Sequence, residues 1–230
     1  MERRPRTAAM PWRWRIGGRT LWIVARRECR VLSWAPLGAG ARIVRVLANH
    51  QVDLDNREAM RAPRSYLAGV VRNAGHDPAR TVALMTGAEV ARVAYATAAR
   101  DGVSVGAWCT AGFSNALRVG DSAGPFAARP GTINLIVMID RPLAVPAMVE
   151  VAALAAEART LAVLEAGIAS AQSGAPATGT GTDCIAIAAP ARASGPGERA
   201  ERWCGKHTLI GELVGRAALA SCTRAIARAR

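Results

Sequence analysis

The sequence has few of the features that would mark a membrane or exported protein. Aromatic residues make up only 4% of the chain, while alanine dominates the apolar half. The core is therefore expected to consist of small side chains that let backbones pack closely. No uninterrupted run of 18 strongly apolar residues is present, so a membrane span is not expected. Arginines also interrupt any apolar segment after Arg3 and Arg4, which argues against a secretory signal.

Paired cysteine motifs are absent as well. The five cysteines are odd in number and contain no C-x-x-C pair, so neither zinc-ligand spacing nor a disulfide framework is evident. Unpaired thiols favour a reducing compartment, and we expect a cytoplasmic protein without a metal site of its own. Each thiol is expected to be a small buried apolar group. The cysteines are Cys29, Cys109, Cys184, Cys204 and Cys222.

Positive charge is abundant but unevenly placed. The net charge is +13, and residues 1–50 carry eleven arginines against Glu2 and Glu28. The rest of the chain is therefore only mildly basic, which does not support a basic groove for nucleic acid. Residues 1–18, with Trp12 and Trp14 among arginines, are expected to form a flexible basic extension. Nucleic-acid binding through residues 1–30 is the alternative, and it would weaken steeply with salt.

Apolar runs and helical periodicity predict a single α/β domain over residues 19–230. Strands and helices mix without strict alternation, so we expect a mixed β-sheet packed with helices in a layered sandwich. Turn-forming residues set the boundaries between elements. Strands are predicted at residues 21–24 and 29–34 (as a hairpin), 81–86, 103–111, 132–139 and 184–189. Helices are predicted at residues 41–48, 88–100, 143–167 and 209–228, and loops at residues 53–65, 170–182 and 191–201.

A run of glycines and hydroxyl residues at positions 178–183 precedes one predicted buried strand. Its glycines permit backbone geometries that expose N–H groups, and its three threonines donate and accept hydrogen bonds. Asp183 would stand at the mouth of the strand, where a partly desolvated carboxylate can act as a base or orient one. The run is neither a P-loop nor a dinucleotide-binding fingerprint. The alternative is a turn whose hydroxyls bind only their own backbone.

Lys206 is the only lysine in the chain. A site that retains lysine in such an arginine-rich composition suggests a need for a compact ammonium group. His207 follows at the predicted start of a helix, where N–H groups oppose protonation of the imidazole and favour a neutral general base. The alternative is a chance lysine beside a capping histidine. Glu157 lies along an apolar stripe of a predicted helix, so it should be paired, with Arg159 or Lys206, or be functional.

Amides and hydroxyls follow or open several predicted strands. They occur at residues 49–51, 110–115, 131–134 and 178–183, and together they predict one cleft lined by neutral hydrogen-bonding groups. The expected substrate-binding side chains are Asn49, His50, Gln51, Asn115, Thr132, Asn134, Thr178, Thr180 and Thr182.

In this order, these segments resemble the adenosylcobinamide amidohydrolase family of corrinoid salvage. The resemblance runs from about Val31 to the C-terminus, and it leads us to expect lysine in place of Arg159. It depends on an ordered set of segments and on no single motif. The segments are residues 32–38, 49–52, 84–86, 110–115, 131–134, 157–160, 178–183, 205–207 and 211–213.

The resemblance implies hydrolysis of the amide that joins the corrin ring's side chain to aminopropanol. The products would be adenosylcobyric acid, which re-enters cobamide (vitamin B12) synthesis, and aminopropanol. The cobalt would be carried by the substrate, so no cofactor is expected. Our own hypothesis for the mechanism is that His207 or Asp183 activates water. Glu157 would then orient the base, and Lys206 would stabilise the oxyanion.

Several alternatives stay open at this point. A covalent route would use Thr180 or Thr182 as nucleophile with His207 as base. A non-catalytic corrinoid carrier or sensor would use the same cleft but release no aminopropanol. Gly211, Gly215, Ala218 and Cys222 recur at helical spacing in the terminal helix. This smooth face could pack against a second subunit, so a homo-oligomer is possible.

Overall fold

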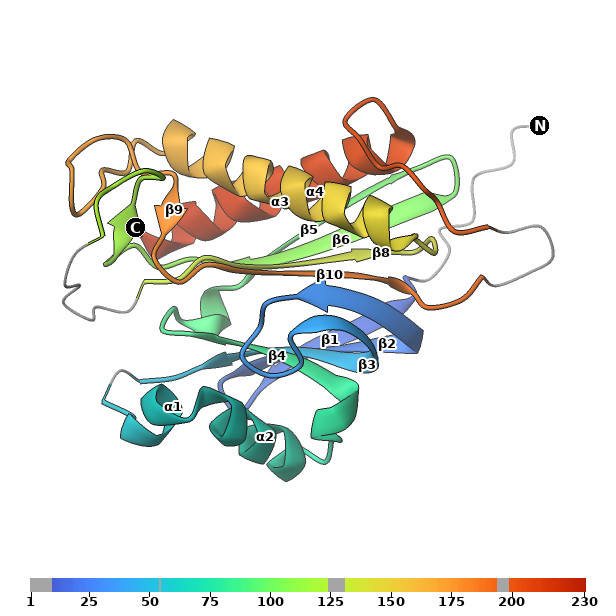
Figure 1. Ribbon diagram of the computed structural model, residues 1–230, viewed down its shortest axis with the longest axis horizontal. Helices are drawn as coiled ribbons and strands as arrows, with labels where there is room; N and C mark the ends of the chain where they lie inside the picture. The colour runs from blue at the N-terminus through green and yellow to red at the C-terminus, as the bar shows by residue number, and fades with distance from the viewer. Residues whose placement is uncertain (1–9, 54, 124–130, 194–198) are drawn as a thin grey trace.

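The strands form a folded sheet between two pairs of helices in the computed structural model, which describes residues 10–53, 55–123, 131–193 and 199–230. Figure 1 shows α3 and α4 above the strands and α1 and α2 below them. The helices are α1 (Arg57–Arg61), α2 (Pro63–Asn73), α3 (Val145–Glu165) and α4 (Leu209–Ala229), with short 3₁₀ turns at Pro78–Arg80 and Val90–Arg92. The strands are β1 (Trp12–Gly17), β2 (Thr20–Ser33), β3 (Gly40–Gln51), β4 (Thr81–Thr86), β5 (Ala94–Arg100), β6 (Val103–Thr110), β7 (Ala116–Leu117), β8 (Asn134–Ile139), β9 (Gly179–Thr180) and β10 (Cys184–Pro190).

The main sheet is mixed, as the sequence predicted. Its order is β4-β3-β2-β10-β8-β6-β5, with β1 beside β2. The pairs β3–β4 and β8–β10 are parallel, and the other neighbours are antiparallel. The sheet folds over on itself, because side chains of β3 and β6 are hydrogen-bonded although these strands are not neighbours. The mixed α/β architecture with helices on a layered sheet is therefore confirmed.

A single strand connects the two layers of the sheet. The 14-residue β2 pairs with β1 and β3 along its first part and with β10 and β3 along its second. The register of β2 against β3 shifts between Val24 and Cys29. The hairpin predicted here is wrong, because the charged residues 26–28 stay in the strand with their side chains exposed at this irregularity.

Three other predicted elements differ from the structure. Residues 41–48 form β3 and residues 94–100 form β5, although both segments were predicted to be helical. In β3, Val44 and Val46 are buried on either side of the exposed Arg45, which is the alternation of a strand. The loop predicted at residues 53–65 instead contains α1 and the first residues of α2, and Pro63 occupies the first turn of α2, where proline is tolerated.

The N-terminal segment is also more ordered than predicted. Residues 12–17 form β1, whose pairing with β2 runs from Trp12 opposite Ala25 to Gly17 opposite Thr20. Trp12 is 4% exposed and packs edge-on against Trp108. The flexible extension expected over residues 1–18 is therefore corrected for residues 12–17, and residues 1–9 lie outside the described part.

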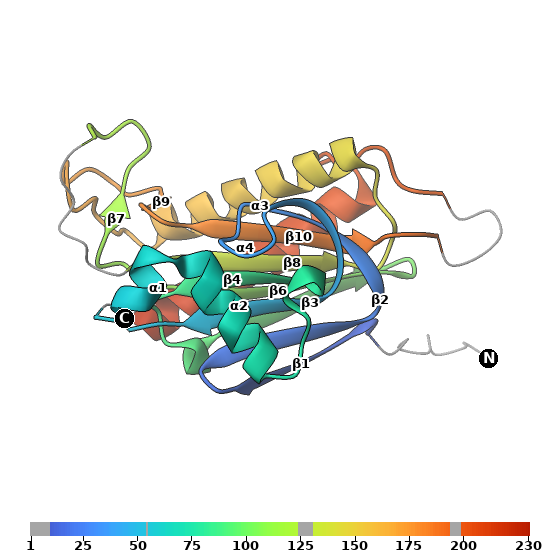
Figure 2. The same ribbon diagram turned by 60° about the horizontal axis from the view of Figure 1, so that its bottom comes forward.

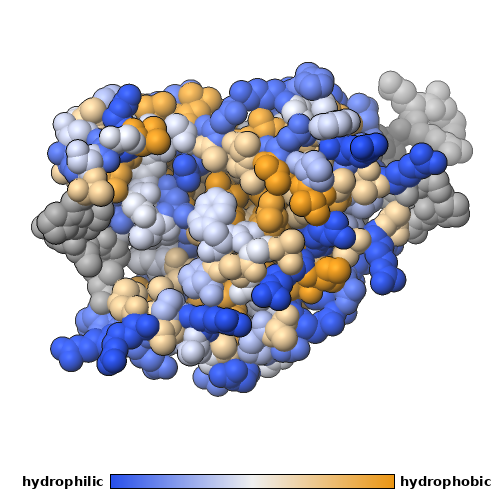
Figure 3. Space-filling view, in the orientation of Figure 1, coloured by the Kyte–Doolittle hydropathy of each residue, from blue (hydrophilic) through white to orange (hydrophobic). Residues whose placement is uncertain are grey.

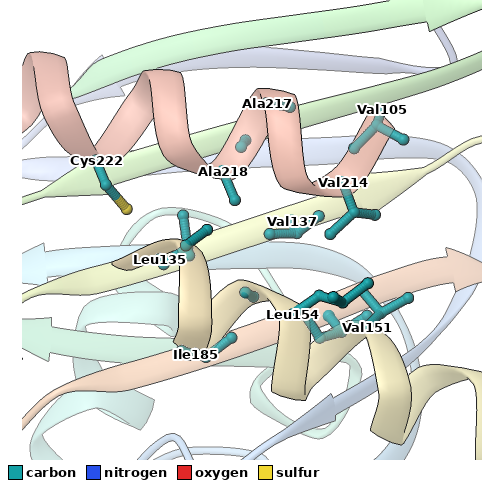
Figure 4. Close-up of a cluster of buried hydrophobic side chains, with 14 of the residues drawn as sticks. Val105, Leu135, Val137, Val151, Leu154, Ile185, Val214, Ala217, Ala218 and Cys222 are labelled. Atoms are coloured by element: carbon teal, nitrogen blue, oxygen red, sulfur yellow. The ribbon is translucent and has the colours of Figure 1, made fainter. Parts of the chain in front are cut away.

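Three apolar clusters hold the layers together. One lies between the sheet and the pair α3 and α4, and Figure 4 shows its side chains from both helices and from β6, β8 and β10. A second lies between the two layers of the sheet, and a third lies beneath α2. Figure 2 shows α1 and α2 lying across β3 and β4. No helix in the described ranges is long and apolar enough to span a membrane.

The small-residue face of α4 lies inside the protein. Ala218 and Cys222 are fully buried in the cluster beneath α3 and α4 (Figure 4). Gly211 lies so close to the preceding segment that an added Cβ would be 2.1 Å from the carbonyl oxygen of Gly205. Apart from Gly215, which is half-buried with open space around it, this face therefore packs within the chain, so little of it is left for a subunit interface.

Candidate active site

A buried network of neutral side chains joins the ends of three strands. The Asn49 amide at the end of β3 donates to Thr110 Oγ1 on β6 at 2.9 Å. The Asn134 amide at the start of β8 donates to Asn49 Oδ1 at 2.8 Å and to the Met85 carbonyl at 2.9 Å. Asn49, Thr110 and Asn134 are each at most 2% exposed. The cleft residues predicted from separate strand ends are thus in direct contact here.

Two acceptors near this network have no partner in the described structure. The side-chain oxygens of Asn134 and Asn115 are buried and accept no hydrogen bond there. An unsatisfied buried polar atom is costly and calls for an explanation, such as a ligand group that supplies the missing donor. The carbonyl of Asn115 accepts from Gly181 N, which places Asn115 against the 178–183 segment.

Asp183 anchors the turn that precedes β10. Its carboxylate accepts hydrogen bonds from Ile133 N at 2.8 Å, from Thr180 N at 2.9 Å and from the Thr180 hydroxyl, and it pairs with Arg159 at 3.1 Å. The side chains of Asp183 and Arg159 are 7% and 16% exposed. Gly179 makes this arrangement possible, since an added Cβ would meet Asp183 Oδ2 at 2.5 Å. With four donors around it, this carboxylate is suited to hold the turn rather than to accept a proton.

The threonines of this turn have different surroundings. Thr182 is exposed, and its hydroxyl lies 2.9 Å from that of Thr132 and donates to the Gly131 carbonyl at 3.0 Å. Thr178 Oγ1 accepts from Val119 N at 2.8 Å and so connects the turn to the β7 region. Thr182 is therefore the hydroxyl of the segment that combines a fixed position with access from solvent.

His50 does not face the asparagine network, and Gln51 makes its side-chain hydrogen bond elsewhere. Because side chains alternate along a strand, His50 points to the opposite face of β3 from Asn49. There its ring nitrogens lie 2.7 Å from Thr20 Oγ1 and 3.2 Å from Tyr66 Oη. Burial lowers the pKa of His50, and the nearby Arg19 lowers it further. Gln51 Oε1 accepts from Val90 N at 3.0 Å, so it fixes the turn after β4.

Lys206 and His207 are not brought to Asp183, contrary to the predicted single site. The segment before α4 lies along the first part and the middle of α3, where Cys204 N donates to Glu150 and Lys206 pairs with Glu157. The 178–183 turn lies against the C-terminal half of the same helix. In Figure 1 the start of α4 is on the right and β9 is on the left. His207 is exposed and belongs to this segment, so the structure does not place it against Asp183 or the threonines of the turn.

Glu157 is paired with Lys206, one of the two partners considered from the sequence. The two groups are 2.5 Å apart, and their side chains are 56% and 70% exposed. The apolar stripe that suggested a buried carboxylate is only partly buried: Leu154 is in the core but Leu161 is 44% exposed, and α3 carries other apolar residues on its outer side too (Figure 3). The pair is therefore an exposed ion pair of small energetic weight.

The thiols are buried, as expected. All five cysteines are free and buried. Burial raises the pKa of Cys29, Cys184 and Cys204 to about 12 in each case, so none of these three is a ready nucleophile. No group of three or more His, Cys, Asp or Glu side chains suited to a metal ion occurs within the described ranges.

Two neighbours of Asp183 were not assigned to the site from the sequence. Arg159 was considered only as a partner for Glu157, yet it pairs with Asp183 from α3. Because Arg159 follows Glu157 by two residues, the two side chains point to different sides of the helix. The spacing could therefore have indicated that they have different partners. Trp34 also contacts the turn, through its indole N–H, and no periodicity in the sequence indicated it.

A mixed α/β domain with polar strand ends meeting at one edge is typical of an enzyme that binds its substrate there. A model of the adenosylcobinamide amidohydrolase family matches residues 13–230. The chain belongs to this family, and at that level it is a hydrolase.

Comparison with individual proteins gives more distant likenesses. The chain is 27% identical over 227 residues to the uncharacterized protein MJ1613 of Methanocaldococcus jannaschii, covering 90% of this chain and 86% of that protein. Among solved structures it is similar to the PH0078 protein of Pyrococcus horikoshii OT3, with a TM-score of 0.47, 11% identity and coverage of 91% and 76%. It is also similar to the L-aminopeptidase D-Ala-esterase/amidase of Ochrobactrum anthropi, described as a variant of the Ntn hydrolase fold. That comparison has a TM-score of 0.43, 11% identity and coverage of 95% and 82%.

Proposed function

We propose that this protein hydrolyses the amide between the corrin side chain and aminopropanol in adenosylcobinamide. The products are adenosylcobyric acid and aminopropanol. Family membership supports the reaction. The observation that carries the proposal is the buried asparagine network, in which the side-chain oxygen of Asn134 has no donor; the side-chain oxygen of Asn115, which lies against the 178–183 segment, has none either.

The chemistry of the network suits this substrate. A corrinoid is a broad macrocycle fringed with amides, whose N–H groups need neutral acceptors and whose carbonyls need neutral donors. Side-chain amides and hydroxyls supply both without the desolvation cost of a charged group. The Asn134 and Asn115 oxygens lack a donor that such amide N–H groups could supply, and because both oxygens are buried the proposal requires the site to open when the substrate binds.

The reacting amide is proposed to lie against Thr182. Thr182 is an exposed residue whose hydroxyl is fixed by Thr132 and Gly131, in a turn that Asp183 holds. In a covalent route, the Thr182 oxygen attacks the amide carbonyl and releases aminopropanol, and water then hydrolyses the ester. In a direct route, water attacks the carbonyl and Thr182 positions it. Both routes consume one water and yield one acid and one amine.

The proposed setting is corrinoid salvage in the cytoplasm, where free thiols stay reduced. The cobalt is part of the substrate, and the proposal requires no cofactor of the protein. A homo-oligomer remains compatible with the proposal, although the reaction as written needs residues of one chain only.

The decisive experiment incubates the purified protein with adenosylcobinamide and measures adenosylcobyric acid and aminopropanol by chromatography. Thr182→Ala should lose all turnover in the covalent route and most of it in the direct route, while Thr182→Ser retains part of it in either, because only the hydroxyl is required. Thr97→Ala, at an exposed position on β5, is the matched control and should behave as wild type. Tight corrinoid binding without release of aminopropanol would instead identify a carrier or sensor.

Acid quench followed by mass spectrometry separates the two routes. An acyl group linked to Thr182 during turnover identifies the covalent route. Turnover without any such adduct, together with partial activity of Thr182→Ala, identifies direct attack by water.

A further inference from the structure

Trp34 is an exposed aromatic side chain held in place beside the proposed site. It follows β2 directly and is 54% exposed. Its indole N–H donates to the backbone carbonyl of Asp183 at 2.9 Å. The ring is thus attached by one edge to the residue after Thr182, and a large part of its surface remains open.

The backbone around Trp34 is fixed as well. The hydroxyl of Ser33 donates to the Ile185 carbonyl at 2.8 Å and accepts from Ala35 N at 3.1 Å. Ser33, before Trp34, is therefore hydrogen-bonded to β10, and Ala35, after it, is hydrogen-bonded to Ser33. Ala35 is also only 1% exposed. The exposed ring is consequently rigid, so a ligand that stacks on it loses little side-chain entropy.

The other tryptophans lack this combination. Trp12, Trp22 and Trp108 are buried, and Trp14 packs against Tyr95 with ring centroids 5.6 Å apart. Trp203 is 64% exposed but lies in the segment before α4, which is away from the 178–183 turn. In the described part of the chain, Trp34 is the exposed indole that contacts the turn and makes no ring contact with another aromatic side chain.

We propose that Trp34 is a stacking platform for a flat conjugated ring of the substrate. This inference rests on the proposed function, since it assigns the platform to the same cleft. Aromatic side chains bind flat rings through dispersion and exclusion of water without reading their edges. Adenosylcobinamide offers two such rings, the corrin macrocycle and the adenine of its adenosyl group, and both share this chemistry.

The test compares steady-state kinetics of three variants on adenosylcobinamide. Trp34→Ala should raise KM roughly fivefold to 150-fold with kcat little changed, since stacking on one aromatic ring is worth about 1–3 kcal/mol. Trp34→Phe keeps an aromatic face but loses the bond to Asp183, and its KM should stay within about threefold of wild type. Trp203→Ala removes an equally exposed indole elsewhere and should leave both constants unchanged.

Equilibrium binding separates the platform from the reaction. Binding of adenosylcobinamide and of cobinamide without the adenosyl group is measured by calorimetry for wild type and each variant. Weaker binding of both ligands by Trp34→Ala identifies the corrin ring, and weaker binding of adenosylcobinamide alone identifies adenine. If wild type binds the ligands but releases no aminopropanol, the proposed hydrolysis is refuted. The stacking role of Trp34 would still be supported, provided that Trp34→Ala binds more weakly than wild type.

Three results would overturn the proposal that Trp34 is a stacking platform. Trp34→Ala could bind and turn over as wild type does, which would leave the ring without a role in binding. Trp34→Phe could be as impaired as Trp34→Ala, with a lowered melting temperature in both, which would make the indole N–H a structural anchor of the turn. Finally, wild type could bind neither ligand.

Discussion

The buried ion pair between Asp183 and Arg159 leads to a stability prediction that can be worked out from its surroundings. Asp183→Asn keeps the shape of the side chain but removes its charge. The new amide nitrogen would also face donors, because each carboxylate oxygen accepts from at least one backbone or side-chain donor. Arg159 would keep its charge at 16% exposure without its partner. Breaking a buried pair in this way costs about 3–5 kcal/mol.

Urea unfolding followed by circular dichroism measures this loss. In thermal unfolding, each kcal/mol of lost stability corresponds to roughly 2–4 °C for a chain of this length. The melting temperature of Asp183→Asn should therefore fall by about 10 °C. Glu89→Gln is the control, since the Glu89–Arg92 pair has side chains 53% and 58% exposed and should contribute at most about 1 kcal/mol.

A double variant tests whether the loss comes from an unpaired charge. Arg159→Leu removes the guanidinium, so Asp183→Asn combined with Arg159→Leu should lose less stability than the sum of the two single changes. The reasoning would be refuted by an Asp183→Asn variant that loses no more stability than Glu89→Gln. Strict additivity in the double variant would contradict it as well.

Three further expectations concern other parts of the molecule. His207→Ala should retain turnover within about twofold because the ring is exposed away from the turn, and a hundredfold loss in the kinetic assay would restore it as the base. Gly211→Ala should destabilise the protein by about 2 kcal/mol or more, since its Cβ would meet the Gly205 carbonyl oxygen at 2.1 Å. Gly215→Ala in the same helix has open space and should stabilise it by about 1 kcal/mol. Urea unfolding measures both changes. His50→Gln should flatten the acid side of the stability curve. Burial lowers the pKa of His50, so the unfolded chain takes up this proton more readily than the native protein, and wild-type stability should fall as the pH drops below about 6.5. Unfolding at pH 8 and pH 5.5 checks this, and equal pH dependence in both proteins would contradict it.

The sequence predicted the central strands and the long helices correctly because they carry strong local signals. Residues 134–139 and 184–190 are nearly continuous apolar runs, which is the pattern of strands covered on both faces. The strands β3 and β5 were predicted as helices because alanine and arginine, both good helix formers, are frequent in them. Pairing with neighbouring strands overrides this preference, and no single-sequence pattern reports that pairing.

The candidate site was predictable only in part, for a related reason. Polar groups at strand ends could be expected to meet, and Asn49, Asn134 and Thr110 do. The position of Lys206 and His207 depends on the direction in which α4 crosses α3, which is a tertiary property. The start of α4 lies near the first half of α3, and Arg230 at the chain's end contacts the Ala166 carbonyl at the end of α3. A motif close to the site in sequence order can therefore lie far from it in space.

The strand shared by both layers also determines how the molecule can come apart. The strand β2 is hydrogen-bonded to β1 and β3 in one layer and to β10 in the other. Neither layer can therefore unfold without leaving backbone N–H and C=O groups of the other layer unpaired. The asparagine network crosses between the same two layers at one end. Loss of the asparagine network and loss of the global fold should therefore be one cooperative event, with no partly unfolded form that keeps the proposed binding site.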